Sequence, residues 1–506
     1  ELGRSVADVE VPVADDAAYA IAPLWAVAGK GRAWLDFQND VTVKDVKQAH
    51  QENFRSVEHL KRYTTMGMAT DQGKTSNISA LAIMAELSGQ SIPDTGTTIY
   101  RPPYTPVSIG VMAGRSTDGH FRPTRLTPSH KWAQEQGASF VETGMWLRAQ
   151  WFPRPGETHW RESVDREVLA TRGSVGICDV TTLGKIDIQG SDAATFINRV
   201  YCNGFAKLAV GKARYGLMLR EDGIAMDDGP TARLAETHFV MTTTTVNAVA
   251  VYRHLEFCRQ CLWPDLDVQL ISTTEAWAQY AVAGPNARKL LQKLVDPEFD
   301  ISNDAFPFMG CGEITICGGL RARLFRISFS GELAFEIAVP TRYGDALIRK
   351  LMAAGKEFDV TPYGAEALGV MRIEKGHAAG NELNGTTTAH NLGMGRMVSQ
   401  TKDSIGAVLS RREGLMREDA LRLVGFRQDP LNAGAHFIAG TNPEAATHDE
   451  GYMTSVAYSP NLGHAIGLGF LKDGGNRLGE TLRAVNPLGG DSVAVEVVSP
   501  HFIDPQ

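Results

Sequence analysis

The spacing of apolar residues predicts helices in the first part of the chain. Residues 43–61 repeat apolar side chains at the spacing of one helix face, and residues 75–87, rich in Ala, Ile and Leu, predict a second helix. Residues 34–37 predict a short strand before these helices. Residues 92–106 are rich in Pro and Thr and predict an extended segment.

The pattern changes near residue 169, where short strands begin to alternate with helices. Turns rich in Gly and Asp separate these elements. From about residue 422, spaced strands and Gly/Asn turns at 473–476 and 486–489 predict a small β-barrel. In the central region the predicted elements are strands at 183–188, 215–219 and 239–245 and a helix at 192–200.

These changes divide the 506 residues into four parts, within an α+β fold. Residues 1–30, Ala-rich and ending in Gly-Lys-Gly-Arg, predict a linker from a preceding domain. A linker domain follows at 31–160, a larger region spans 161–420, and the barrel occupies 421–506. Because the first residue is Glu1 rather than Met, we expect a processed or truncated chain that continues upstream.

Composition and charge exclude several classes of function. A net charge of −8 and the lack of a long Lys/Arg run argue against nucleic acid as a partner. No apolar run approaches the length of a membrane-spanning helix, so no membrane partner is expected. The six cysteines are sparse, which fits the cytoplasm, and the pair Cys258 and Cys261 lacks the further ligands of a zinc site. No metal site is predicted.

A polar segment between two predicted helices is dense in hydrogen-bond donors. The stretch Gly67–Thr75 resembles a phosphate-binding loop but has five residues between its glycines instead of four, and no apolar strand precedes it. The donors still suit an anion such as a cofactor phosphate. A solvated loop with a helix cap is an equal alternative. The candidate donors are Lys61, Arg62, Thr64, Thr65, Lys74, Thr75, Ser76 and Asn77.

Two adjacent carboxylates, Asp227 and Asp228, follow a predicted strand and turn. Turn chemistry alone explains Asp and Gly at such a place. In an extended segment, however, neighbouring side chains point to opposite faces, so only one of the two can face a ligand.

A third acidic residue, Glu336, lies between Phe335 and Ile337 in a predicted strand. A buried, unpaired carboxylate there is costly, so the side chain either faces solvent or binds a ligand. Its two oxygens match the adjacent N–H groups of a pterin ring. Residues 363–376 predict a helix that ends at Gly376, with Arg372 and Glu374 as structural ion partners.

Taken in order, several motifs resemble those of the glycine-cleavage T-protein family over residues 165–506. Upstream segments at 36–42, 64–77 and 101–106, and residues 217–223, resemble the alpha subunits of heterotetrameric sarcosine oxidases, over their C-terminal half. The T-protein-like motifs are Gly-Ile-Cys-Asp at 176–179, Asp227-Asp228, Gly284-Pro285, Ser330-Gly331-Glu332, Arg-Ile-Glu-Lys-Gly at 372–376, and Thr-Ser-x-x-Tyr-Ser-Pro at 454–460.

The resemblance implies a three-domain cloverleaf that binds tetrahydrofolate centrally and ends in a small β-barrel, preceded by an α/β linker domain. It implies that Asp228 is catalytic and that Tyr215, Thr244 and Glu336 bind folate. T-proteins carry an Arg at the position of Leu368, so the folate tail must be held differently here.

The sarcosine oxidase resemblance implies a complex. A beta subunit that carries flavins oxidises an N-methyl amine, with smaller gamma and delta subunits present and FAD elsewhere in the complex. NAD would bind in an N-terminal half that precedes residues 1–30. FMN lies between alpha and beta, attached to beta, so the donors of residues 61–77 become FMN contacts. This chain would transfer the one-carbon unit to tetrahydrofolate and form 5,10-methylenetetrahydrofolate.

Two alternatives remain open at this stage. The chain is equally suited to an N-methylglutamate dehydrogenase-like complex, since the residues that select the amine lie in a partner. It is otherwise a non-catalytic scaffold with the folate fold only. Neither the amine nor the electron acceptor follows from the sequence.

Overall fold

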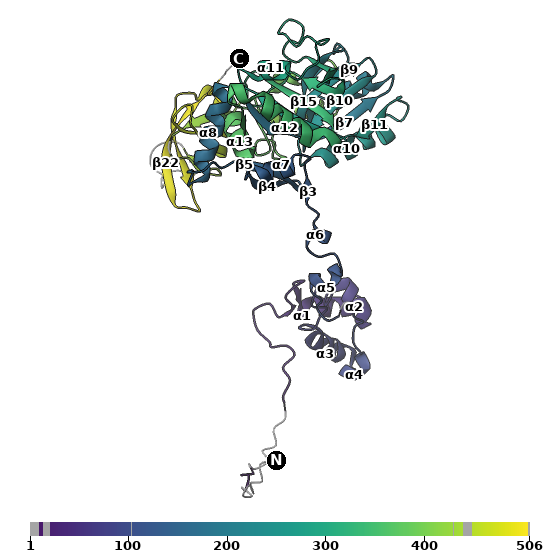
Figure 1. Cartoon of the computed structure of the whole chain (residues 1–506). Helices are drawn as coiled ribbons and strands as arrows, with labels where there is room; N and C mark the ends of the chain where they lie inside the picture. Colours follow the sequence, from purple (N-terminus) through teal and green to yellow (C-terminus); the bar gives the residue numbers. More distant parts are fainter. Residues whose placement is uncertain (1–9, 14–20, 103, 429, 439–447, 504–506) are drawn as a thin grey trace, which may run out of the picture. The chain divides into compact units, whose positions relative to one another are not determined.

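The computed structural model describes residues 10–13, 21–102, 104–428, 430–438 and 448–503. The chain forms two compact units, Glu1–Phe121 and Arg122–Gln506, which we describe separately (Figure 1). Most of the predicted linker at 1–30 lies outside the described residues.

The first unit is mainly helical. A short pairing of β1 (Trp34–Asp36) with β2 (Val41–Thr42) precedes the helices. The first three helices form an apolar core that includes Val46, Leu60 and Ile83. The helices are α1 (Val43–Gln51), α2 (Val57–Thr64), α3 (Asn77–Ser88), α4 (Ile92–Thr95), α5 (Ile109–Ala113) and α6 (Asp118–Phe121).

Two sequence predictions for this unit were wrong in detail. The single helix expected at 43–61 is broken into α1 and α2, because Asn53 adopts a left-handed backbone with φ of 74°. The segment expected to be extended begins with α4, whose first turn is capped by the Ser91 hydroxyl and contains Pro93.

The second unit contains an antiparallel five-stranded sheet in the order β11-β7-β10-β9-β8. Helices α9 (Ala193–Val200) and α10 (Ala248–Phe257) contribute to the apolar core of this sheet, together with Phe239 and Met241. The strands are β7 (Gly184–Gln189), β8 (Lys212–Leu219), β9 (Ala225–Ala235), β10 (His238–Thr243) and β11 (Gln269–Ser272).

A six-stranded sheet in the order β13-β14-β15-β12-β6-β16 forms the second layer. Helices α11 (Ala287–Gln292) and α12 (Gly344–Ala354) pack on it. The strands are β6 (Gly176–Asp179), β12 (Trp277–Ala283), β13 (Cys311–Ile316), β14 (Leu320–Phe325), β15 (Ala334–Pro340) and β16 (Thr361–Pro362).

The boundary between the units lies earlier than residue 160, where the sequence suggested it. The small sheet of β3 (Arg125–Leu126), β5 (Trp146–Trp151) and β4 (Ser139–Thr143) belongs to the second unit. Trp132 of α7 (His130–Glu135) and Phe152 are buried in the core beneath the six-stranded sheet, which explains why residues 122–160 fold with it.

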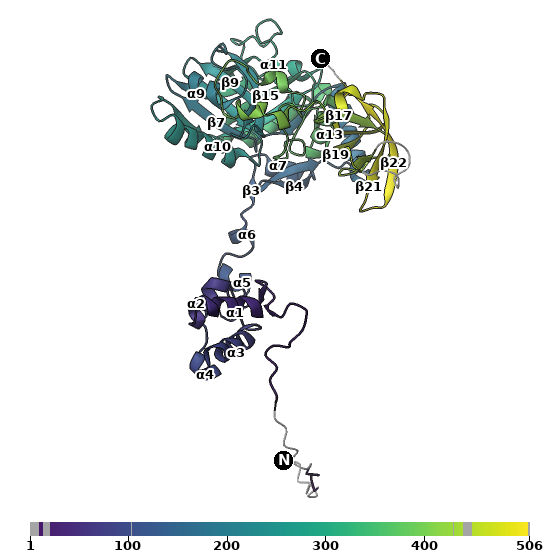
Figure 2. The ribbon, with the colours of Figure 1, turned by 180° about the vertical axis from the view of Figure 1, so that it is seen from behind.

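The predicted C-terminal barrel is confirmed. Six strands close in the order β17-β20-β19-β18-β21-β22, with β17 paired to β22. Helix α13 (Ala365–Lys375) lies beside this barrel in both views, as does α8 (Trp160–Gly173) in the first (Figures 1 and 2). The strands are β17 (Leu421–Arg427), β18 (His436–Ile438), β19 (Gly451–Ser459), β20 (His464–Lys472), β21 (Thr481–Asn486) and β22 (Asp491–Val498).

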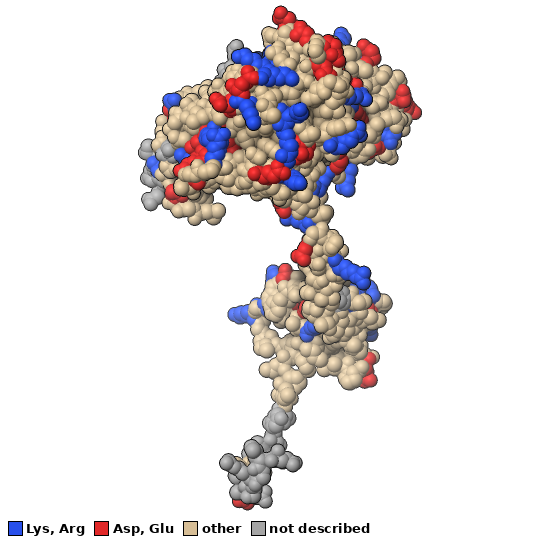
Figure 3. All heavy atoms as spheres, in the orientation of Figure 1, with Lys and Arg blue, Asp and Glu red and all other residues tan. Residues whose placement is uncertain are grey.

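Acidic and basic side chains are interspersed on the face of the second unit shown in Figure 3. Among the described residues, no helix has both the length and the apolar character that a membrane crossing requires.

Buried ion pairs join α8, α13 and the strands. Arg172 contacts Glu332 and also Glu374, at 2.5 Å from Nη2 to Oε2. The hydroxyl of Ser459, on β19, donates to the other oxygen of Glu374 at 2.5 Å. Arg372 pairs instead with Glu382, at 2.9 Å. Arg372 and Glu374 therefore both form structural ion pairs, but not with one another: Arg372 pairs with Glu382 and Glu374 with Arg172.

We expect Arg172→Met to lower the free energy of unfolding of the second unit by about 3–5 kcal/mol, because it leaves two buried carboxylates without their cation. Urea unfolding measures this change. Arg417→Met removes an exposed partner of Asp419 and serves as the control, with no measurable change expected. Equal stability of the two variants would contradict a structural role for the Arg172 cluster.

Candidate functional site

The predicted catalytic carboxylate lies on the five-stranded sheet. Asp228 on β9 is 7% exposed and accepts a hydrogen bond from the Tyr215 hydroxyl on β8, with 2.6 Å between the oxygens. Antiparallel pairing sets Leu217 opposite Asp228, which brings Tyr215 within reach two residues along the neighbouring strand. The structure therefore unites two of the residues that the sequence proposed for folate transfer.

The neighbouring carboxylate, Asp227, is directed elsewhere. Its two oxygens accept hydrogen bonds from the Thr244 backbone N–H at 3.2 Å, the Thr244 hydroxyl at 2.7 Å and the Asn247 amide at 3.1 Å. Strand alternation places it on the opposite face of β9 from Asp228. Thr244, which the sequence proposed as a folate contact, thus donates its hydroxyl to Asp227.

Burial changes the acidity of both groups. Desolvation raises the pKa of Asp228 to about 7, against the opposing effect of the Tyr215 hydrogen bond. Desolvation also raises the pKa of Asp227, although its hydrogen bonds from Thr244 and Asn247 act in the other direction. A carboxylate with a pKa near neutrality is suited to accept and release a proton at physiological pH.

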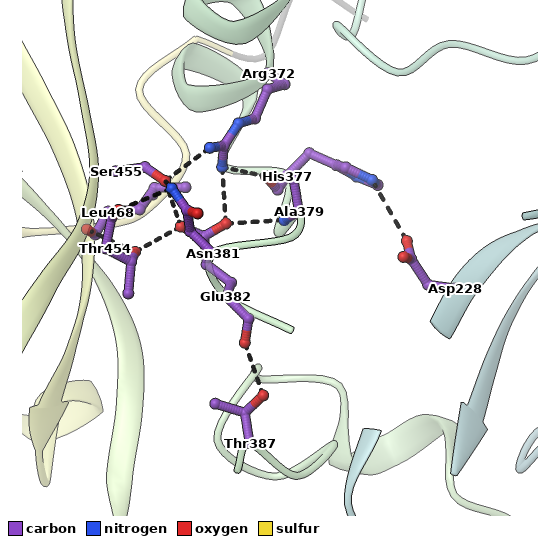
Figure 4. A network of polar contacts seen from close by, with 10 residues as sticks. All are labelled: Asp228, Arg372, His377, Ala379, Asn381, Glu382, Thr387, Thr454, Ser455 and Leu468. Carbon is purple, nitrogen blue, oxygen red and sulfur yellow. Dashed lines mark hydrogen bonds and ion pairs between the residues drawn. The ribbon is translucent and has the colours of Figure 1, made fainter. Parts of the chain in front are cut away.

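His377 is a site residue that sequence reasoning missed. Its Nε2 lies 3.8 Å from Asp228 Oδ2 (Figure 4), and its ring contacts the rings of Tyr215 and Phe329 edge-on, with centroid distances of 5.8 and 4.7 Å. Desolvation and the nearby cation of Arg372 lower the pKa of His377 to about 4. The sequence feature that could have drawn attention to His377 is its position directly after Gly376, the glycine that ends α13.

Glu336 lies on the six-stranded sheet, in β15, and is 8% exposed. It accepts a hydrogen bond from the amide of Gln279 on the adjacent strand β12. Burial raises the pKa of Glu336, while Gln279 and the positive charge of Lys185 oppose that rise. Glu336 is therefore neither exposed to solvent nor left without a partner.

Lys185, on β7, is a buried cation near Glu336. Its ammonium donates to the backbone oxygens of Thr181 and Leu183, at 2.7 and 3.0 Å. Desolvation lowers the pKa of Lys185 to about 8. Because β7 belongs to the five-stranded sheet, the charge of Lys185 connects that sheet electrostatically to Glu336.

The proposed flavin contacts lie in the first unit, where most of the donors already have partners within the chain. Lys61 is 7% exposed and donates to the Ile99 backbone oxygen, and Asn77 is buried and donates to Thr98. The side chains of Arg62, Thr64, Thr65 and Thr75 donate to Glu58, Leu60, Thr64 and Asp71 respectively.

Lys74 instead borders a cleft of about 470 Å³ in this unit. Its ammonium lies 4.2 Å from the centre of the Tyr104 ring and donates to the Tyr104 backbone oxygen. Tyr100 packs against Tyr104 with a centroid distance of 4.4 Å. The remaining lining is mostly apolar and includes Ile78, Leu81, Ile92 and Pro93. This combination of aromatic rings and one cation suits a planar anionic ligand.

Two further sequence predictions concern Leu368 and metal binding. Leu368 is partly buried among apolar side chains of α8 and α13. Over the described residues, no group of three or more His, Cys, Asp or Glu side chains is arranged to hold a metal ion.

The fold and the sequence both match known families. The GCVT N-terminal domain model matches residues 129–402, the glycine cleavage T-protein C-terminal barrel domain matches 422–504, and the sarcosine oxidase A3 domain matches 30–115. The chain belongs to the glycine-cleavage T-protein family. Its second unit accordingly has an aminomethyltransferase-like fold, with the A3 domain as an additional N-terminal domain.

Two curated relatives are similar to this chain over most of its length. The chain is 53% identical to the sarcosine oxidase subunit alpha of Rhizobium meliloti (strain 1021), over 96% of this chain and 50% of that protein. It is 45% identical to that of Corynebacterium sp. (strain P-1), over 94% and 49%. The chain thus spans about half the length of these curated relatives.

A solved structure shares the fold. The aminomethyltransferase of the glycine cleavage system from Bartonella henselae aligns with a TM-score of 0.65 and 24% identity, over 76% of this chain and 99% of that one.

Proposed function

We propose that this chain is the folate-transfer part of a sarcosine oxidase-type complex. Its reaction would pass the one-carbon unit of an oxidised N-methyl amine to tetrahydrofolate and give 5,10-methylenetetrahydrofolate. The observation that carries the proposal is the buried pair of Asp228 and Tyr215 within a T-protein fold. The 53% identity to a sarcosine oxidase subunit alpha supports the same assignment.

Asp228 performs the central step. The oxidised amine is an imine or iminium, which water would otherwise hydrolyse to formaldehyde. As a folate nitrogen attacks the carbon and forms the first C–N bond, the imine π electrons move to the amine nitrogen and Asp228 accepts the proton that the folate nitrogen loses. The second folate nitrogen then forms its bond to the same carbon, the bond from that carbon to the amine nitrogen breaks, and the demethylated amine leaves with the two protons that the folate nitrogens lose. A positioned base of suitable pKa is worth roughly 10²–10⁴-fold in rate. Tyr215 orients the carboxylate through its hydrogen bond.

Glu336 anchors the acceptor in this proposal. A carboxylate accepts two parallel hydrogen bonds from adjacent N–H groups, as a pterin ring presents them. Its buried position strengthens such bonds, and the Gln279 amide fixes one of its oxygens. The hydroxyl of Thr244 already donates to Asp227. We therefore propose that Thr244 contributes to folate binding either with the rest of its side chain or indirectly, by holding Asp227 on β9.

The contact of this chain with a flavin-carrying subunit is also proposed. We propose that Lys61–Asn77 faces FMN held by a beta subunit, and that Lys74 with Tyr100 and Tyr104 supplies the accessible contact. The same complex would hold FAD, NAD, and gamma and delta subunits. An N-methylglutamate dehydrogenase-like complex would use this chain identically, and the co-purifying subunits identify which complex forms.

A non-catalytic scaffold would not require a desolvated carboxylate aligned by a tyrosine. The raised pKa of Asp228, at about 7, is a cost that a scaffold has no reason to retain. A titration with tetrahydrofolate separates the scaffold from the transfer subunit, since only the latter binds it.

We expect a structure of the assembled complex to place Lys74 within direct or single-water hydrogen-bonding reach of the FMN phosphate. Lys47, an exposed lysine of α1 in the same unit, is the internal control and should not contact flavin. A separation of more than about 10 Å between segment 61–77 and every flavin would refute the interface, since no bridging water spans it.

We expect Asp228→Asn to redirect the product of the assembled complex. Amine oxidation should continue unchanged, while formaldehyde replaces methylenetetrahydrofolate, because the attacking nitrogen lacks its base. Quantifying both products during turnover measures the partition. Asp227→Asn is the matched control. It should lower thermal stability through the loss of its bonds to Thr244 and Asn247, but keep the folate product.

Two results would count against this assignment. Loss of the folate product in Asp227→Asn alone would reverse the roles of the two carboxylates. An unchanged partition in both variants would remove the transfer function itself.

We expect Glu336→Gln to weaken tetrahydrofolate binding by roughly 10–100-fold, since a hydrogen bond to a charged group contributes about 1.5–3 kcal/mol. Isothermal titration calorimetry measures the dissociation constant. Glu236→Gln changes an exposed carboxylate and should leave binding unaltered. Equal affinities in the two variants would show that Glu336 does not contact the pterin.

A further inference from the structure

His377 lies beside Asp228 but has no role in the proposed transfer step. Its Nε2 approaches Asp228 Oδ2 at 3.8 Å, on the side of the carboxylate that Tyr215 Oη also contacts. The side chain is about a quarter exposed, at 23%, whereas the Asp228 side chain is 7% exposed. The imidazole is therefore a polar group directed toward the carboxylate rather than a filler of the apolar core.

The turn that carries His377 is fixed from behind by a buried ion pair. Arg372 donates to the His377 backbone oxygen at 3.2 Å and to Glu382 at 2.9 Å. The same oxygen of Glu382 accepts from the Ala379 backbone N–H at 2.9 Å. One cation and one anion thus hold the loop at His377 and at Ala379, as Figure 4 shows.

The barrel holds that ion pair in place. Ser455 and Thr454, both on β19, donate their hydroxyls to the second oxygen of Glu382, at 2.7 and 2.5 Å. Arg372 also donates to the Ser455 hydroxyl at 2.7 Å. Glu382 is fully buried and has four hydrogen-bonding partners among these residues. A network so fully satisfied rigidifies the backbone that it holds.

The helix end gives the turn its direction. Gly376 ends α13 in a left-handed conformation with φ of 75°. A Cβ at this position would lie 2.3 Å from the Pro500 backbone oxygen, so no larger residue fits without a backbone shift. The left-handed backbone of Gly376 therefore sets the direction in which the chain leaves α13, and His377 is the next residue.

We propose that His377 is a positioning residue for the transfer reaction: its neutral ring donates Nε2–H to Asp228 and so favours the ionised, proton-accepting carboxylate. This inference rests on the proposed function. The distance of 3.8 Å is longer than a hydrogen bond, and such catalytic contacts commonly tighten only when the substrate is bound.

The charges around His377 support a neutral donor. Arg372 and Lys375 lie on the helix before it and disfavour protonation, whereas Glu382 opposes them. Asp228 and Tyr215 face it from the sheet. With its pKa at about 4, the imidazole stays neutral at pH 7 and can give Asp228 only a hydrogen bond, without taking up the proton.

The sign of the effect follows from this arrangement. A hydrogen bond to the charged form lowers a carboxyl pKa, so the His377 N–H, once within bonding distance, holds the pKa of Asp228 lower than it is without that bond, and loss of the N–H raises it again. Folate capture, which needs the ionised form, would then require a higher pH. A bond worth about 1.5–3 kcal/mol corresponds to a shift of about one to two pH units.

The test follows the fraction of methylenetetrahydrofolate among the products of the assembled complex between pH 5.5 and 9. We expect His377→Phe to raise the midpoint of this profile by about one to two pH units. His377→Gln retains an N–H donor and should restore the midpoint at least in part. His377→Met also lacks the donor and replaces the Phe variant should the larger ring impair folding.

The outcomes separate this inference from the function on which it rests. An unchanged midpoint in both His377→Phe and His377→Met, with Asp228→Asn still diverting product to formaldehyde, would overturn the role of His377 alone. An unaltered partition in Asp228→Asn would instead overturn the transfer function. A merely structural histidine would lower stability in all three His377 variants without moving the midpoint.

Discussion

The structure of the second unit depends on two buried arginines. Arg172 lies in the last turn of α8 and Arg372 in the last turn of α13, and each contacts a carboxylate that is fully shielded from water. Isolated buried charges are costly, so these cations and anions are stable only with their complete sets of partners. Those partners come from α13, the loop that follows it, the loop before β15 and β19 of the barrel. The two clusters therefore fix these separate elements relative to one another.

This constraint explains the distribution of the family motifs. The side chains of these motifs that join the two clusters are those of Ser330, Glu332, Arg372, Glu374, Thr454, Ser455 and Ser459. The motifs that identify the family are therefore largely structural, and they support the site from outside. The chemistry itself rests on fewer groups, above all Asp228 and the side chains around it.

Local patterns predicted the local features. Spaced turns predicted the barrel, and strand alternation predicted that Asp227 and Asp228 would differ in role, which agrees with their separate hydrogen bonds. The resemblance, rather than the pattern, supplied Tyr215. The left-handed Asn53 was missed because a helical repeat continues across it. The partners of Arg372 and the approach of His377 to Asp228 connect positions far apart in the chain, and no local spacing encodes them.

Two raised carboxyl pKa values couple folding of the second unit to proton uptake. Asp228 has a pKa of about 7 when folded and an ordinary value of 3.8. Glu167, a buried residue of α8 that accepts hydrogen bonds from the backbone N–H groups of Phe152 and Gly364, has its pKa raised by burial to about 7 from 4.5. Between these limits the folded chain keeps protons that the unfolded chain releases. These two groups therefore contribute to the free energy of unfolding in acid, and their contribution is lost as pH rises through 7. The ionised carboxylate that makes Asp228 a base is thus also a strained state of the fold, which other interactions must offset at neutral pH.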